Sequence, residues 1–157
     1  MDRDDWLLLF LAQPALNGRH VAPMEPLKVM KGMFLVTRRG GPSLSDLYEF
    51  EPYDYGPFTR DIYRDLDSLR DDGLVAEAAV PGRSWRTYRP TEAGIERALA
   101  LQKVADAAER TTLDDAHRFV ATRTFLRLLR DIYAAYPDFA VNTVVKDAAP
   151  QQRPAAG

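Results

Sequence analysis

The sequence feature that most constrains the fold is an amphipathic segment, residues 57–72, followed directly by two short strand-like segments. Its apolar residues recur at spacings of three and four: Phe58, Ile62, Leu66 and Leu69. At about 100° per residue these side chains share one face of a helix, and the Gly56-Pro57 pair is typical of a helix start. Gly73 follows as a helix-ending glycine, and residues 74–80 and 85–89 have strand composition around a Pro-Gly turn. The sequence therefore predicts a helix that leads into a β-hairpin.

Further helices are predicted on both sides of this unit. They are an apolar helix that opens at Asp2, Asp4 and Asp5 and is closed by Pro14, a helix over 26–39, a short helical turn over 43–48, a helix capped by Thr91, and a long C-terminal helix over 112–136 capped by Thr111 or Thr112. The first is apolar on every side from Trp6 to Leu11, so we expect it to be buried on most of its surface. The fold class expected is mainly α with a small β-hairpin (α+β).

The helix over 26–39 has an apolar face and a basic remainder. Its apolar face carries Leu27, Met30 and Phe34. The predicted polar surface of this helix carries Lys28, Lys31, Arg38 and Arg39. Residues 50–55 are then read as a connection dense in aromatic residues and proline.

The order helix, helix, short turn, helix, hairpin, helix is the winged-helix arrangement. Three motifs carry the likeness: the L-x-x-L pair Leu66–Leu69, the run Asp72-Gly73-Leu74-Val75, and the run Tyr88-Arg89-Pro90-Thr91-Glu92-Ala93-Gly94. Over residues 57–100 the chain resembles winged-helix regulators of the PadR and MarR type. The resemblance implies a winged helix-turn-helix, with N-terminal helices and a long C-terminal helix added. It does not by itself imply DNA binding, because winged helices also serve as protein-interaction modules.

A second resemblance covers most of residues 5–146. Its motifs are Lys28-x-x-x-Gly32-x-Phe34-Leu35, the run Phe50-Glu51-Pro52-Tyr53-Asp54-Tyr55-Gly56-Pro57-Phe58, and Tyr133-x-x-Tyr136-Pro137-x-x-Ala140-x-Asn142-Thr143. These are similar to YwgA-like proteins and, more loosely, to SocA-like (Panacea) antitoxins. The antitoxin branch implies protein neutralisation or adaptor work, and the YwgA-like branch implies little. Together, the two resemblances predict a single winged-helix domain over 1–146 (core 26–108). The composition of residues 147–157, rich in Ala, Pro and Gln, predicts a disordered tail.

The leading functional hypothesis is a dimeric, winged-helix DNA-binding transcriptional regulator that contacts double-stranded DNA. The predicted contacts are Thr59, Arg60, Tyr63 and Arg64 on the central helix and Arg83 and Arg86 on the hairpin. Against this, residues 53–89 contain six basic and seven acidic residues, and the whole chain has a net charge of −2. DNA-binding domains usually present a basic surface. Asp61 and Asp65 are expected to pair with Arg64 and neighbouring arginines, which leaves a solvated, salt-bridged face as the competing interpretation.

The alternative function is a non-catalytic interaction module for a protein partner, a toxin or a regulator. Tyr53, Tyr55 and Phe58 would form its partner-binding patch, although the same rings could instead be a structural plug. On the C-terminal helix, Arg123, Arg127 and Arg130 form a basic ridge that ordinary amphipathicity also explains. Its apolar stripe predicts either a homodimer contact or packing within the chain.

Composition excludes several other classes. Without cysteine there are no disulfides, thiolate zinc sites or cysteine nucleophiles, and His20 and His117 are the only histidines. There is no phosphate loop, dinucleotide fingerprint or nucleophile elbow, so we expect no enzyme activity, cofactor or metal. The apolar run Trp6–Ala12 is far shorter than the roughly 20 residues of a spanning helix and follows acidic residues. We therefore expect a cytoplasmic protein with no membrane association.

Overall fold

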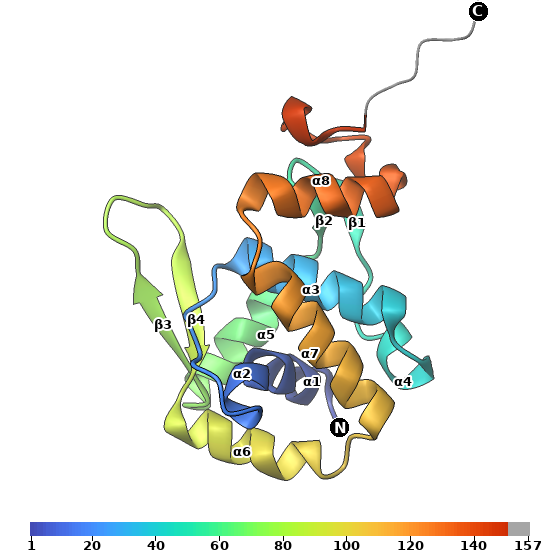
Figure 1. Ribbon diagram of the computed structural model, residues 1–157. Coiled ribbons are helices and arrows are strands. Elements are labelled where there is room, and N and C mark those ends of the chain that lie inside the picture. Colours follow the sequence, from blue (N-terminus) through green and yellow to red (C-terminus); the bar gives the residue numbers. More distant parts are fainter. Residues whose placement is uncertain (151–157) are drawn as a thin grey trace, which may run out of the picture.

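The computed structural model describes residues 1–150, which form a mainly helical α+β fold with two small antiparallel strand pairs (Figure 1). This confirms the coarse prediction of a mainly α fold of the α+β class. The helices are α1 (Arg3–Leu11), α2 (Gln13–Leu16), α3 (Pro26–Arg39), α4 (Pro42–Ser45), α5 (Arg60–Asp71), α6 (Glu92–Gln102), α7 (Ala107–Ala121) and α8 (Phe125–Ala135), followed by 3-10 turns at Pro137–Ala140 and Lys146–Ala148. The strand pairs are β1 (Glu51–Tyr53) with β2 (Gly56–Phe58), and β3 (Val75–Ala79) with β4 (Arg86–Pro90).

Helix α1 lies inside the molecule, packed against α5, α6 and α7. Every side chain from Trp6 to Ala12 is buried, as its uniformly apolar sequence predicts. The ring of Phe10 rests on Gly32 of α3, where an added Cβ would lie 2.3 Å from the ring. The glycine of the Lys28-x-x-x-Gly32 motif therefore permits the close approach of α1 and α3.

The predicted hairpin forms as β3 and β4, in a register that pairs Val75 with Pro90, and the central helix is present as α5 with a later start than predicted. The hydroxyl of Thr91 caps α6 by accepting from the Gly94 N–H at 3.0 Å. Gly94 packs directly against the backbone of Leu74, the residue before β3. A Cβ at position 94 would lie 2.0 Å from the Leu74 carbonyl oxygen. These contacts fix α6 across the base of the β3–β4 hairpin.

The predicted aromatic connection is instead part of the first hairpin of the chain, β1–β2, and the predicted helix start at Gly56-Pro57 is wrong. Pro57 lies in β2 opposite Pro52, a position that a two-stranded ribbon tolerates because its outer edge needs no N–H donor. Gly56 takes a left-handed φ of +86°, which the tight turn requires. Helix α5 begins only at Arg60, with Thr59 as its N-cap.

The single long helix predicted over 112–136 is also wrong. Helix α7 starts at the capping box of Asp106 and Glu109, so Thr111 and Thr112 lie inside it rather than at its cap. Helix α7 ends at Ala121. Thr124 then caps a separate helix, α8, by accepting from the Arg127 N–H. In Figure 1, α7 runs beside α3 while α8 crosses over β1 and β2.

The apolar stripe of α8 is used within the chain. Its buried residues are Leu128, Leu129, Ile132 and Tyr133. They pack beside β2 and the two 3-10 turns, so they are not free to contact a second copy. Of the two predicted alternatives for this stripe, a homodimer contact or packing within the chain, the structure has packing within the chain.

Both chain ends differ from the prediction in detail. Pro14 does not close the first helix, which ends at Leu11; it lies in the first turn of α2, where proline is tolerated. Of the predicted disordered tail over 147–157, the first residues are folded, since Ala148 is buried in a 3-10 turn. Residues 151–157 lie outside the described part. No helix within residues 1–150 has the length and apolar character to cross a membrane.

Candidate functional site

Two acidic residues of α5, Asp61 and Asp65, are paired with an arginine of α1. Arg3 donates to both carboxylate oxygens of Asp65, at 2.6 and 3.0 Å, and to Asp61 at 3.3 Å. The Tyr48 hydroxyl donates to the same buried Asp65, and burial with this contact raises the pKa of Tyr48. Hydrogen bonding to Asp65 raises the pKa of Arg3 as well. Asp61 and Asp65 are therefore neutralised mainly by Arg3, a partner that the sequence analysis did not identify.

A second acidic cluster surrounds Arg70 at the other end of α5. Arg70 contacts Asp67 and Asp71, each at 3.2 Å, and Glu77 at 2.5 Å. Glu77 also accepts from Arg86 at 2.9 Å, which ties one predicted DNA contact to the middle of β3. The carboxylates of this region thus have arginine partners within the protein.

The predicted DNA contacts occupy different environments. Arg60 is exposed and has no ion pair or hydrogen bond to another side chain among residues 1–150. Arg64 has its side chain 75% exposed, with a single long contact of 3.6 Å to Asp61. Arg83 lies over the ring of Trp85, 5.0 Å from its centroid. Thr59, by contrast, is buried and its hydroxyl caps α5, so it does not belong to this exposed face.

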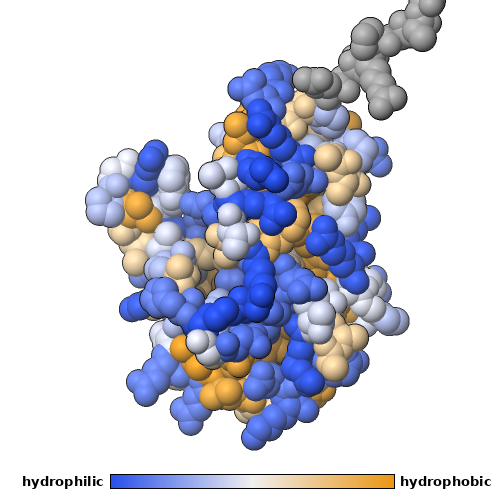
Figure 2. Space-filling model, in the orientation of Figure 1, coloured by the Kyte–Doolittle hydropathy of each residue, from blue (hydrophilic) through white to orange (hydrophobic). Residues whose placement is uncertain are grey.

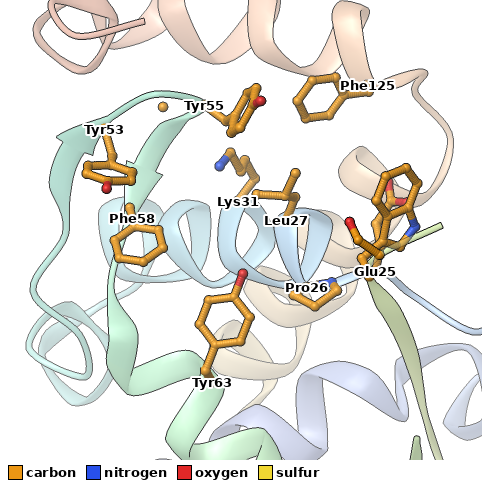
Figure 3. A pocket seen from close by; sticks show the side chains of 12 residues that line it. Glu25, Pro26, Leu27, Lys31, Tyr53, Tyr55, Phe58, Tyr63 and Phe125 are labelled. Atoms are coloured by element: carbon orange, nitrogen blue, oxygen red, sulfur yellow. The ribbon is translucent and has the colours of Figure 1, made fainter. Parts of the chain in front are cut away.

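Beside this face lies a hollow of about 600 Å³, walled largely by aromatic rings (Figure 3). The rings come from four elements: Tyr53, Tyr55 and Phe58 of the first hairpin, Tyr63 of α5, Trp85 of the second hairpin, and Phe125 of α8. Tyr53, Tyr55 and Trp85 are 50%, 43% and 42% exposed, so they form an open rim. Figure 2 shows the tip of the second hairpin as a separate lobe beside the body of the molecule.

The floor of the hollow contains a buried lysine. Lys31 of α3 is only 1% exposed, and its Nζ donates to the Pro57 carbonyl oxygen at 3.2 Å. No carboxylate lies within ion-pair distance of Lys31 in the described part of the chain. Burial lowers the pKa of Lys31 to about 7.

The sequence analysis placed Lys31 on the polar surface of its helix, which is wrong. The signal was present, because Lys31 lies four residues after Leu27 and three before Phe34, on the apolar face. What covers the side chain is the β1–β2 hairpin, which periodicity alone did not predict.

The remaining candidates have structural roles. His117 is buried against the ring of Phe10, at 5.2 Å between centroids, and burial lowers its pKa to about 4. Arg123 lies between α7 and α8 and shares Asp131 with Arg127, so the predicted basic ridge is partly neutralised. Within residues 1–150, no three His, Asp or Glu side chains are grouped to hold a metal ion.

No known family model matches the chain, and a comparison with curated proteins gives no match. Function is therefore inferred from the residues of this chain. Two neighbouring features define the site: the exposed arginines of α5 and the second hairpin, and the aromatic hollow with Lys31.

Proposed function

We propose that the protein is a winged-helix DNA-binding transcriptional regulator, with α5 as the recognition helix and β3–β4 as the wing. The observation that carries this proposal is that Arg60 and Arg64 are exposed on the first half of α5. Within residues 1–150, Arg60 has no ion pair and Arg64 has only the 3.6 Å contact with Asp61. The two elements face one space, because Tyr63 of α5 and Trp85 of the hairpin line the same hollow. Double-stranded DNA is the proposed partner and the cytoplasm the proposed location.

The charge arrangement supports this orientation despite the net charge of −2. Arg3 pairs with Asp61 and Asp65 in the first half of α5, and Arg70 pairs with Asp67 and Asp71 in its second half. The N-terminal half of a recognition helix is the part that usually enters the major groove. Arg60 and Arg64 would reach guanine edges or phosphates there, with Tyr63 beside them, while Arg83 and Arg86 would contact phosphate.

Selection of genomic fragments by the purified full-length protein, followed by affinity measurements on the enriched duplex and on random duplexes, tests the proposal. Arg64→Ala should weaken specific binding by about 1–3 kcal/mol if the side chain reads a base. Arg83→Ala should lower the salt slope by about 1 with an equal loss on both duplexes. Arg130→Ala removes an arginine of α8 that is not among the proposed DNA contacts; it is the control and should change neither.

Failure to enrich any sequence, or equal losses for Arg64→Ala and Arg130→Ala, would contradict DNA reading by this face. Equal losses of Arg64→Ala on specific and random duplexes would remove only its base-reading role.

The second candidate function is a non-catalytic protein-interaction module of antitoxin or adaptor type, and the exposure of Tyr53 and Tyr55 favours it. Tight intrahelical ion pairs of Arg60 and Arg64 would also favour this interpretation. Such tight pairs are not found within residues 1–150, where Arg64 has only its long contact with Asp61. A stoichiometric protein complex that survives nuclease and is lost in Tyr53→Ala/Tyr55→Ala, with no DNA enriched, would replace the DNA-binding proposal.

A further inference from the structure

The hollow holds one feature that DNA binding does not use, the amine of Lys31. It is the only lysine among the four in the chain that is buried. An ammonium group has three N–H donors, yet within residues 1–150 Lys31 Nζ has one acceptor, the Pro57 carbonyl oxygen at 3.2 Å. Burial without a carboxylate partner favours the neutral amine, whose pKa is lowered to about 7. The neutral amine can donate to Pro57 and retain a free lone pair.

The surroundings of the amine suit a flat, apolar ligand. Tyr53 and Phe58 have ring centroids 4.8 Å apart, and Tyr55 and Phe125 have centroids 5.9 Å apart. In Figure 3 the amine end of Lys31 points toward the space between Tyr53 and Tyr55, and the Tyr63 hydroxyl points upward from α5 into the same hollow. A volume of about 600 Å³ is in the range of pockets that hold small organic ligands.

Two classes of ligand suit an amine surrounded by aromatic rings. One is an anion, and the other is an electrophilic carbonyl compound. An aromatic carboxylate would have to lose its hydration in a site with one cationic partner, and the desolvation cost of such a buried ion pair can exceed its Coulombic gain. A neutral carbonyl compound avoids that penalty, and its reaction also removes the cost of a buried ammonium. A neutral lysine in an apolar pocket is the form that acts as a nucleophile.

We infer that Lys31 is a covalent binding site for planar aromatic aldehydes, which its amine captures as an imine inside the aromatic hollow. This inference goes beyond the proposed DNA-binding function and does not depend on it. The Nζ lone pair forms a bond to the carbonyl carbon, the C=O π pair moves to oxygen, and a proton passes from nitrogen to that oxygen. The resulting carbinolamine loses its hydroxyl group and the remaining N–H proton as water, which leaves C=N. Aldehyde and amine give imine and water, with no oxidation or reduction.

The test is reductive trapping on the full-length protein with 2-naphthaldehyde and sodium cyanoborohydride, read by intact mass and peptide mapping. At pH 7.5 we expect Lys31 to be labelled at least about tenfold faster than Lys28, Lys103 or Lys146, because far more of its amine is neutral. Acetaldehyde, which gains nothing from the rings, should show a much smaller preference for Lys31. Trp85 at the rim should be quenched on binding, and this signal should be absent in Trp85→Phe.

Lys31→Met should lose the adduct and Lys28→Met should retain it. Because labelling of the unmodified protein is mapped site by site, the test remains decisive even if Lys31→Met fails to fold. Labelling of Lys31 no faster than of the other lysines would overturn the inference. Tight binding of 2-naphthoate with no trapped aldehyde would overturn it too, in favour of an anion site.

Discussion

At the scale of single residues, Lys31 makes stability depend on pH in an unusual window. Its pKa is about 7 in the folded chain against an ordinary value of 10.5, so between these values the unfolded chain binds more protons. The free energy of unfolding should therefore rise as the pH increases from about 7 to about 10.5, by up to roughly 5 kcal/mol from this group. Below pH 7 both states are protonated and the full cost of the buried ammonium is present.

Lys31→Met should stabilise the protein at pH 7 and remove this rise, as urea unfolding at a series of pH values would measure. Lys103→Met, at an exposed position, is the control and should leave the dependence unchanged. A wild-type stability curve that is flat across this window would show that water or a local opening solvates the amine.

At the scale of elements, Gly94 sets how closely α6 approaches the β3–β4 hairpin. A Cβ at this position would lie 2.0 Å from the Leu74 carbonyl oxygen, which is backbone and cannot turn aside. Gly94→Ala should therefore push α6 off the hairpin and lower the free energy of unfolding by about 1–3 kcal/mol. Gly41→Ala has open space around it at an ordinary φ, so it should be neutral in the same urea titration. Equal stability of the two variants would contradict the tight contact.

Elements were predictable where local chemistry and periodicity agreed. The helix over 26–39, the β3–β4 hairpin and the Thr91 cap are found as predicted, because each combines a clear pattern with a cap or turn residue. The β1–β2 hairpin was missed because proline after glycine suits a helix start as well as a turn into an edge strand. The break before Thr124 was missed because apolar periodicity continues through it, and only the cap bond to Arg127 marks the new helix.

The same distinction applies to the candidate site. The exposure of Arg60, Arg64 and Arg83 follows from helix periodicity and turn composition. The contacts around these arginines and in the hollow depend on long-range packing. Arg3 reaches Asp65 across 62 positions of the sequence, and Lys31 contacts the Pro57 carbonyl across 26. No local pattern encodes such pairs, so the neutralised acids and the buried amine could be found only from the structure.

At the scale of the whole molecule, α1 makes the chain one cooperative unit. The segment 57–100, whose motifs resemble those of winged-helix regulators, buries Ile62, Leu66 and Leu69 in the same core as α1, and its Asp65 is paired with Arg3. Expressed alone, residues 57–100 should show no cooperative thermal transition by circular dichroism, since the apolar face of α5 would be left in water.

In the full chain, the two tryptophans report on distant parts of this unit, Trp6 in buried α1 and Trp85 at the tip of the second hairpin. Trp6→Phe leaves Trp85 as the fluorescent reporter, and Trp85→Phe leaves Trp6. In each variant, the urea transition seen by fluorescence should coincide with the loss of helix that far-ultraviolet circular dichroism shows for the same variant. Coincidence is expected because the hairpin is fixed at its base by Gly94 and Thr91 of a helix that itself packs on α1. A Trp85 signal that changes at lower urea than the helix signal would mean that the hairpin opens separately, and that the hollow it borders is assembled by a local equilibrium rather than by the fold as a whole.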